Sequence, residues 1–185
     1  EDWATNEGGS DYFATLKCLR KMFPGATAPT GTDAFAAKAC NDSFPAGADR
    51  NRCLSNTLAG QSVAFLFQAL SRTPAPPMFN TPDPSVVAAT EDGHPDTQCR
   101  LDTYFQGALC TKPVSEEVSK TSPLPGSCTA AGGFSKGFRP LCWYHPAPGE
   151  AAPANIAERP VSLPSEKALN QTLDSLREAL SGSGR

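Results

Sequence analysis

The chain has 185 residues, of which 39% are hydrophobic and 19% charged. This composition fits one globular domain with a core and excludes collagen-like and fully disordered proteins. The formal net charge of −3 offers no electrostatic basis for binding nucleic acid or an anionic membrane, so neither is expected as a partner. The longest apolar run, residues 63–67, is far too short to span a bilayer.

The first half of the chain is expected to be helical. A helix over residues 5–23 is predicted from one stripe of apolar side chains at helical spacing: Tyr12, Leu16, Leu19 and Phe23. A short helix capped by Thr32 or Asp33 is predicted through residues 34–39. Residues 52–72 are apolar nearly all round in their middle, which is typical of a buried helix and predicts the central helix of the fold.

The second half is expected to mix one helix with long irregular segments. Five prolines in residues 74–93 favour a surface segment without regular structure. A helix is predicted to begin at Pro95-Asp96 and to bear one apolar face: Leu101, Tyr104, Phe105 and Ala108. The rest is rich in Pro, Gly and Ser, with a packed loop around its aromatic side chains. The fold class predicted is mainly α, an irregular helical domain over residues 1–145 with long Pro/Gly-rich loops.

The C-terminal part carries a separate element. The Ala/Pro/Glu composition of residues 146–164 is typical of a linker. After it, Ser165 can cap an amphipathic helix over residues 165–181. This helix bears one narrow leucine stripe: Leu169, Leu173, Leu176 and Leu180. A stripe of this kind can dock on its own domain or pair with a partner.

Seven cysteines are the strongest compositional signal. None is within ten residues of another, no Cys-x-x-Cys pair occurs, and the chain has two histidines, so a zinc ribbon is a poor interpretation. Disulfide bonds explain the cysteines better. Because disulfides persist in oxidising compartments, a secreted or periplasmic protein is expected.

The positions of the cysteines predict one pair and leave the others open. Cys40 closes one predicted helix and Cys53 opens the next, so these two are expected to be bonded. Cys99 and Cys110 fall on one predicted helix, about 16 Å apart, and cannot pair with each other unless that helix is broken. Two more cysteines can pair together or with these two: Cys128 and Cys142. The odd one, Cys18, is expected to be unpaired or paired outside the chain.

The opening residues form the one group of side chains whose types and spacing suggest a metal site. Glu7 and Asp11 are four residues apart and share a face of the predicted helix, with Ser10 beside them. Gly8 and Gly9 weaken that helix by roughly 1 kcal/mol each relative to alanine and allow another backbone or a ligand to come close. One such carboxylate can bind a metal while the other orients a ligating imidazole. The alternative is an ordinary acidic helix start, favoured by the helix dipole.

This stretch resembles the third-ligand helix of the thermolysin-like zinc metallopeptidases, the gluzincins. Their pattern is Asn-Glu-x-x-Ser-Asp, matched here in order by four residues: Asn6, Glu7, Ser10 and Asp11. The resemblance implies that Glu7 binds zinc and that Asp11 orients a zinc-binding histidine, with Asn6 and Ser10 as supporting residues. It also implies zinc as cofactor, a peptide or protein as substrate, and peptide-bond hydrolysis in the complete enzyme.

The chain departs from that family in one large respect. The family takes two zinc ligands and a general base from His-Glu-x-x-His, which this chain lacks, since its two histidines, His94 and His145, are isolated. The chain alone is therefore expected to be inactive and to contain no catalytic residue. It would be the part of a secreted peptidase after that motif, a processed piece, or an inactive relative. The alternative is a non-catalytic, secreted, disulfide-rich helical interaction module whose helix 165–181 engages a partner.

Overall fold

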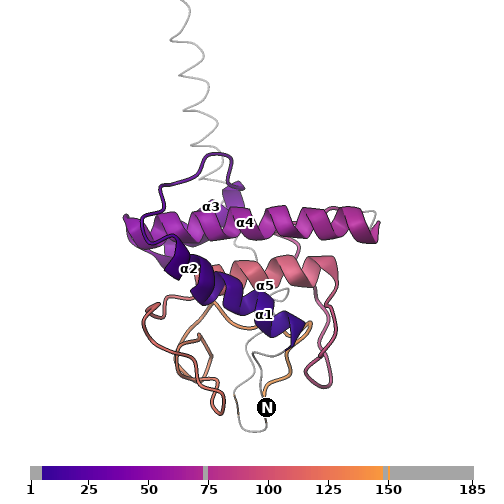
Figure 1. Cartoon of the computed structure of the whole chain (residues 1–185). Helices are drawn as coiled ribbons and strands as arrows, with labels where there is room; N and C mark the ends of the chain where they lie inside the picture. Colours follow the sequence, from indigo (N-terminus) through magenta and orange to yellow (C-terminus); the bar gives the residue numbers. More distant parts are fainter. Residues whose placement is uncertain (1–5, 73–74, 148–149, 151–185) are drawn as a thin grey trace, which may run out of the picture.

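The computed structural model of the chain describes residues 6–72, 75–147 and 150 (Figure 1). This part contains helices and irregular segments without a strand, which confirms the mainly α fold class. The elements in chain order are α1 (Glu7–Phe13), the π-helical segment η1 (Ala14–Cys18), α2 (Leu19–Met22), α3 (Ala34–Ser43), α4 (Ala48–Ser71) and α5 (Thr97–Leu109). In Figure 1, α4 runs above α5, and the α1–α2 stretch crosses in front of α5.

The central helix is α5. Every residue of α5 except Gln98 is buried, because α1, η1, α3, α4 and the long irregular segments all pack around it. Its polar side chains have specific partners inside the protein. Asp102, for example, accepts hydrogen bonds from the backbone N–H of Asp83 (2.7 Å) and from Gln98 (2.9 Å). The helix predicted over residues 52–72 is present as α4, but the prediction that it is the central helix was wrong.

Glycines allow the neighbouring helices to approach α5 closely. A Cβ atom on Gly60 of α4 would lie 2.5 Å from the Cβ of Tyr104 on α5. A Cβ atom on Gly107 of α5 would lie 2.3 Å from the hydroxyl oxygen of Thr15 and 2.6 Å from the carbonyl oxygen of Tyr12. All three distances are far below any real contact of a Cβ atom, so these two crossings require glycine.

The predicted helix over residues 5–23 is present, but its buried face changes along its length. In a π-helical turn one extra residue is accommodated, so residues after the turn are rotated relative to an unbroken α-helix. Tyr12 and Leu16 are fully buried as the stripe predicts. Beyond η1, however, Arg20 is buried and Phe23 is 54% exposed. The uniform stripe from Tyr12 to Phe23 is therefore corrected at its C-terminal end.

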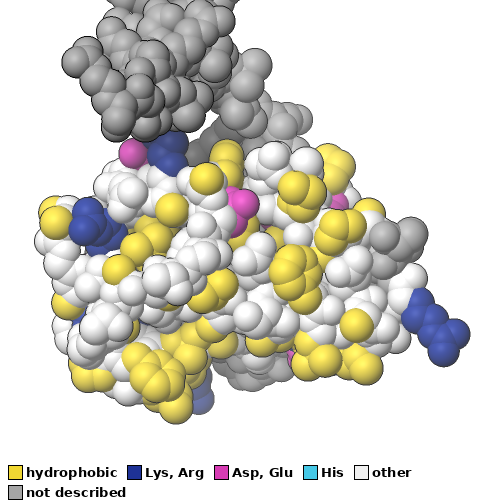
Figure 2. Space-filling view, turned by 90° about the horizontal axis from the view of Figure 1, so that it is seen from above, with side chains coloured by type: hydrophobic (Ala, Val, Ile, Leu, Met, Phe, Trp, Pro, Cys, Tyr) yellow, Lys and Arg dark blue, Asp and Glu magenta, His cyan; other side chains and the backbone are white. Residues whose placement is uncertain are grey.

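The helix α4 is covered on one side only. Its first half is tied to α3 and α5, with Cys53, Asn56 and Gly60 buried. Its second half presents four large apolar side chains to solvent: Val63, Phe65, Leu66 and Leu70. Figure 2 looks down on the α3–α4 side of the molecule and shows many hydrophobic and few charged side chains there. The sequence pattern of a fully buried helix thus occurs on a helix whose second half is open.

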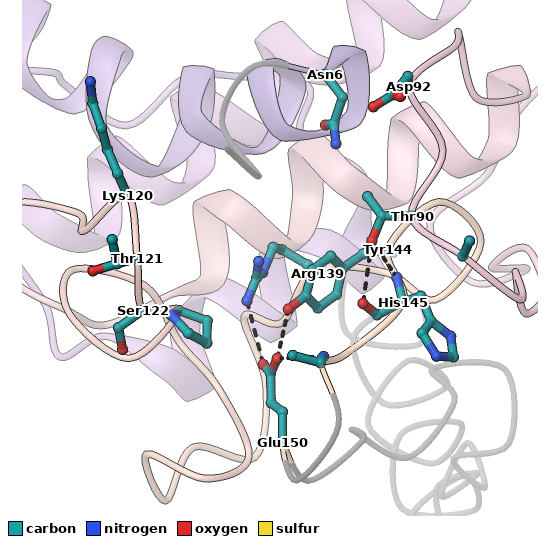
Figure 3. Close-up of a pocket in the computed structure, with 13 residues that line it drawn as sticks. Asn6, Thr90, Asp92, Lys120, Thr121, Ser122, Arg139, Tyr144, His145 and Glu150 are labelled. Atoms are coloured by element: carbon teal, nitrogen blue, oxygen red, sulfur yellow. Dashed lines mark hydrogen bonds and ion pairs between the residues drawn. The ribbon is translucent and has the colours of Figure 1, made fainter. Parts of the chain in front are cut away.

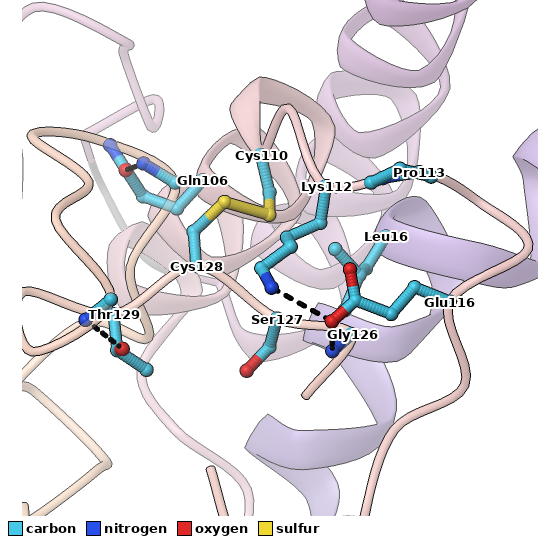
Figure 4. The surroundings of a disulfide bond; sticks show 12 residues. Leu16, Gln106, Cys110, Lys112, Pro113, Glu116, Gly126, Ser127, Cys128 and Thr129 are labelled. Carbon is cyan, nitrogen blue, oxygen red and sulfur yellow. Dashed lines mark hydrogen bonds and ion pairs between the residues drawn. A yellow bond between two sulfur atoms is a disulfide. The ribbon is translucent and has the colours of Figure 1, made fainter. Parts of the chain in front are cut away.

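Three disulfides connect the helices to one another and to the loops. Cys40–Cys53 joins the end of α3 to the start of α4, the pair expected from the turn between them. The two bonds of the second half hold α5 at both ends, Cys99–Cys142 at its start and Cys110–Cys128 just after its end (Figure 4). Cys18 forms no bond with these cysteines and is exposed. The three disulfides indicate an oxidising compartment. Within the described ranges, none of the helices has the length and apolarity needed to cross a bilayer.

The irregular segment after α5 packs onto the helices, as its aromatic residues predict. Phe138, Trp143 and Tyr144 are buried. The packing continues past His145, because Glu150 accepts a hydrogen bond from the Tyr144 hydroxyl at 2.7 Å. Glu150, which falls in the expected linker over residues 146–164, is therefore in contact with the packed segment. The rest of that linker and the expected helix 165–181 lie outside the described residues.

Candidate functional site

The motif residues start helix α1. Asn6 is the N-cap, and its side-chain Oδ1 accepts a hydrogen bond from the backbone N–H of Gly9 at 2.7 Å. The Ser10 hydroxyl donates to the carbonyl oxygen of Asn6 at 2.9 Å. These contacts fix the first turn and place Glu7 at the helix N-terminus, where the dipole favours a carboxylate. Asn6 and Ser10 thus support the site through the backbone.

Gly8 is required by a large neighbour. A Cβ atom on Gly8 would lie 2.3 Å from Cδ2 of Trp143, whose side chain is completely buried. The absence of a side chain therefore lets the indole ring of the distant loop lie against the first turn of α1. The space expected near this glycine for another backbone or a ligand is filled by the protein itself.

The two carboxylates of the motif meet one arginine. Arg100 on α5 donates to both oxygens of Asp11, from Nε to Oδ2 at 2.8 Å and from a terminal nitrogen to Oδ1 at 2.9 Å. The same terminal nitrogen lies 2.7 Å from Oε1 of Glu7. The Tyr104 hydroxyl, one turn further along α5, donates to Oδ1 of Asp11 at 2.6 Å. The guanidinium stacks on the Phe67 ring of α4 at 3.7 Å from its centroid.

Burial and hydrogen bonding act in opposite directions on the pKa values of Asp11 and Arg100. Burial raises the pKa of Asp11, although the hydrogen bonds from Arg100 and Tyr104 act in the opposite direction. Burial also lowers the pKa of Arg100, but the hydrogen bond and charge of Asp11 outweigh this effect and the net shift is upward. Burial and the neighbouring carboxylate of Asp11 raise the pKa of Tyr104, so its hydroxyl remains a donor. The cluster is a bidentate ion pair with a neutral third member.

Glu7 is more open than Asp11. Its side chain is 32% exposed, against 8% for Asp11. Within the described part of the chain, every ion pair of its side chain involves Oε1, which lies 2.7 Å from Arg100 and 3.2 Å from Nδ1 of His94. His94 is itself largely exposed. One oxygen of Glu7 is therefore held in place, while the carboxylate as a whole remains within reach of solvent.

A polar cavity of about 370 Å³ adjoins the start of α1 (Figure 3). Asn6 contributes to its wall, and the other labelled residues come from the segments 89–92, 120–123 and 139–150. Inside it, Arg139 pairs with Glu150 at 3.4 Å and lies over the ring of Tyr144, 3.6 Å from its centroid. Thr90 and His145 exchange hydrogen bonds of 3.0 and 3.2 Å. Glu7 and Asp11 do not line this cavity.

The cavity contains one buried cation. Arg139 is 3% exposed, and burial lowers the pKa of its guanidinium. Burial raises the pKa of Tyr144, which keeps that hydroxyl protonated and donating to Glu150. The carboxylate of Glu150 therefore lies between a cation and a hydroxyl donor, and these contacts link Glu150 to Arg139 and Tyr144 of the same irregular segment.

Two cysteines lie in a cluster of metal-binding residue types, but they are bonded to each other. One group of three metal-binding residue types has its ligand atoms close together: Asp83, Cys99 and Cys142. Because Cys99 and Cys142 are bonded to each other, neither offers a thiolate. The described residues therefore supply no closed zinc site, and Glu7 is the zinc-ligand candidate that remains from the sequence.

Sequence reasoning found the carboxylates but missed their partners. Arg100 and Tyr104 are one helical turn apart, and an arginine on an otherwise apolar helix face is a signal for a buried ion pair. That signal does not identify the partner of the arginine, because Glu7 and Asp11 are about ninety residues away in sequence.

Comparisons with protein-family models, with curated proteins and with solved structures give no match to this chain.

Proposed function

We propose that this chain is the portion of a secreted zinc metallopeptidase that supplies the third zinc ligand and the helical subdomain around it. The observation that carries the proposal is the arrangement of the motif carboxylates. Glu7 and Asp11 stand on one face of α1, where Arg100 contacts both of them. Asp11 is buried, and Glu7 is held by one oxygen while its side chain stays partly exposed.

The chemistry of Glu7 fits a zinc ligand. Zinc accepts carboxylate oxygens together with imidazole nitrogens. A carboxylate that is anchored through Oε1 can present its other oxygen to a metal without losing the contact to Arg100. Metal ligands are commonly oriented by such secondary contacts, and here Arg100 and the capped first turn of α1 would supply them.

The rest of the ligand set must come from elsewhere. A catalytic zinc site needs three protein ligands and an open position. The proposal therefore requires two imidazoles from a His-Glu-x-x-His segment outside this chain. In the complete enzyme the zinc would supply an activated water for peptide-bond hydrolysis. Asp11 would then accept a hydrogen bond from one of those imidazoles, beside the bonds it accepts from Arg100 and Tyr104.

The proposal predicts the behaviour of four proteins. The chain alone should bind zinc weakly and have no peptidase activity, because it lacks a closed ligand set. The protein completed with the His-Glu-x-x-His segment should bind one zinc ion and cleave peptides. In that protein Glu7→Ala should abolish zinc retention, measured as metal content after gel filtration. Asp11→Ala should reduce zinc affinity or activity by roughly 10- to 100-fold.

A matched control separates ligand loss from loss of charge. Glu91→Ala removes an exposed carboxylate of the same type, and zinc content and activity should be unchanged. Unchanged zinc content in the Glu7→Ala variant would show that the motif is an ordinary acidic helix start tied to Arg100. Peptidase activity of the isolated chain would show that the active site lies elsewhere in it.

A second candidate function is favoured by a different observation. The open apolar half of α4 is unusual on a solvated helix and is typical of a binding surface. This supports the alternative, a non-catalytic, disulfide-rich helical module that binds another protein. Failure of the completed protein to bind zinc, together with stable binding of another protein, would favour this alternative.

A further inference from the structure

The open half of α4 carries a regular apolar stripe. Ala59, Val63, Leu66 and Leu70 follow one another at spacings of four, three and four residues. At 100° per residue these positions lie within about 60° of one another around the helix. Ala59 is half-buried, whereas Val63, Leu66 and Leu70 are 36%, 56% and 69% exposed, so the stripe is uncovered by the described residues from Val63 onward. This spacing is that of the contact seam between two packed helices.

The surroundings of the stripe are also those of a covered helix. From Cys53 to Ser71 the helix contains no charged residue, although much of this stretch faces solvent. A helix face exposed to water normally carries charged side chains. Phe65 is also exposed, but it lies about 100° round the helix from Leu66 and is therefore outside the stripe. The composition and the spacing both point to a second helix along α4.

A segment of the same chain has the complementary pattern. Residues 165–181 lie outside the described residues, and their four leucines repeat the spacing of the α4 stripe: Leu169, Leu173, Leu176 and Leu180. We propose that this segment packs as a helix along α4, with its leucine stripe against the α4 stripe. Each stripe extends over 12 residues, which is 11 helical steps, so the two seams have the same length of about 16 Å.

The connection is long enough for this docking. Residues 151–164 separate Glu150, the last described residue, from the start of the segment. When extended, these 14 residues reach about 46 Å. A domain of about 150 residues has a radius of gyration near 15 Å, so this reach allows the chain to pass from Glu150 to α4.

Tethering favours the chain's own segment over a second copy. A tethered helix has an effective concentration on the order of millimolar, well above ordinary protein concentrations. An isolated helix of this length is also marginal in water and needs an apolar surface to form. The proposal is independent of the zinc site, since none of its residues belongs to the cluster around Arg100.

The docking is tested in the full chain by paired alanine variants. Alanine is a strong helix former, so the variants remove apolar contact without weakening either helix. Leu66→Ala with Leu70→Ala on α4, and Leu173→Ala with Leu176→Ala on the segment, should each lower the melting temperature by about 4–8 °C. The four substitutions together should lower it by clearly less than the sum, because both pairs remove the same contact. The control pair, Gln171→Ala with Glu178→Ala, lies off the stripe and should have no effect.

Hydrogen exchange of the unmodified chain gives an independent readout. Amides of residues 169–180 should exchange at least about 10-fold more slowly than in an unstructured peptide. The chain should also be monomeric by light scattering. Exchange of this segment at the unstructured rate would overturn the proposal, as would additive effects of the two alanine pairs. A dimer that dissociates when Leu66 and Leu70 are replaced would overturn it in favour of a second copy on α4.

Discussion

Replacing Arg100 by methionine should strongly destabilise the protein, because the change leaves Asp11 buried without a cation. The side chain of Asp11 is 8% exposed and has two charge-assisted hydrogen bonds from Arg100. Breaking a buried pair by removing one partner typically costs about 3–5 kcal/mol. Loss of the contact to Glu7 and of the stacking on Phe67 acts in the same direction. For a chain of this size, we expect a fall in melting temperature of about 10 °C.

The cost should depend on pH with a defined sign. Without Arg100, burial and the charge of Glu7 are opposed only by the hydrogen bond from Tyr104, so the pKa of Asp11 lies further above its ordinary value of 3.8. The folded variant then binds a proton more tightly than the unfolded chain, so its stability rises as the pH falls toward 4. The destabilisation by Arg100→Met should therefore be larger at pH 8 than at pH 4.

The assay is urea unfolding of both proteins at the two pH values, followed by circular dichroism. Arg50→Met, which removes a positive charge from the first turn of α4, is the matched control and should change stability by less than about 0.5 kcal/mol. Adding Asp11→Asn to Arg100→Met should recover part of the loss, because the uncompensated charge is gone. A cost below about 1 kcal/mol, or one equal at pH 4 and pH 8, would refute the reasoning, since a solvated surface pair behaves in that way.

Three further predictions use other parts of the fold. Burial raises the pKa of Asp102 to about 7, so the folded state binds this proton more tightly than the unfolded chain, and the free energy of unfolding should fall by about 2–3 kcal/mol from pH 5 to pH 8. Urea titrations of Asp102→Asn should show a smaller fall, and an unchanged pH profile would contradict the assignment. Gly8→Ala should destabilise the folded protein by about 1–3 kcal/mol because the added Cβ overlaps Trp143. The control Gly25→Ala, whose Cβ would meet no atom within 4 Å, should be nearly neutral. A stabilising effect of Gly8→Ala would show that the higher helix propensity of alanine outweighs the overlap. Thiol titration of the unreduced protein should find one reactive group per chain and none in Cys18→Ser, whereas a second thiol would mean an open disulfide.

Local patterns predicted the elements well. The helices predicted over residues 34–39 and 52–72 and from Pro95-Asp96 correspond to α3, α4 and α5. They follow from apolar spacing, from a cap at Thr32 or Asp33, of which the structure uses Asp33, and from the prolines between them. The bond Cys40–Cys53 follows from a short turn between two helices. All of these depend on interactions within a few turns of chain, which a sequence displays directly.

The importance of each helix could not be predicted in the same way. Residues 52–72 have the more apolar sequence, yet the buried centre is α5, with Arg100, Asp102 and Gln106 inside. Polar side chains can be buried when they are hydrogen-bonded, and their partners come from distant parts of the chain. The backbone N–H of Gly137, for example, donates to Gln106 at 2.8 Å. Hydrophobicity alone therefore predicts the wrong helix as the central one.

The sequence by itself determined the class of the protein: a helical, disulfide-bonded chain of an oxidising compartment with an acidic motif at its first helix. Tertiary structure alone decided how Cys99 and Cys110 are paired, which side of α4 stays open, and what Glu7 and Asp11 contact. The physical reason is the same in each case. These features depend on groups far apart in sequence, and only the packing of α1, α4 and the loops around α5 brings those groups within bonding distance.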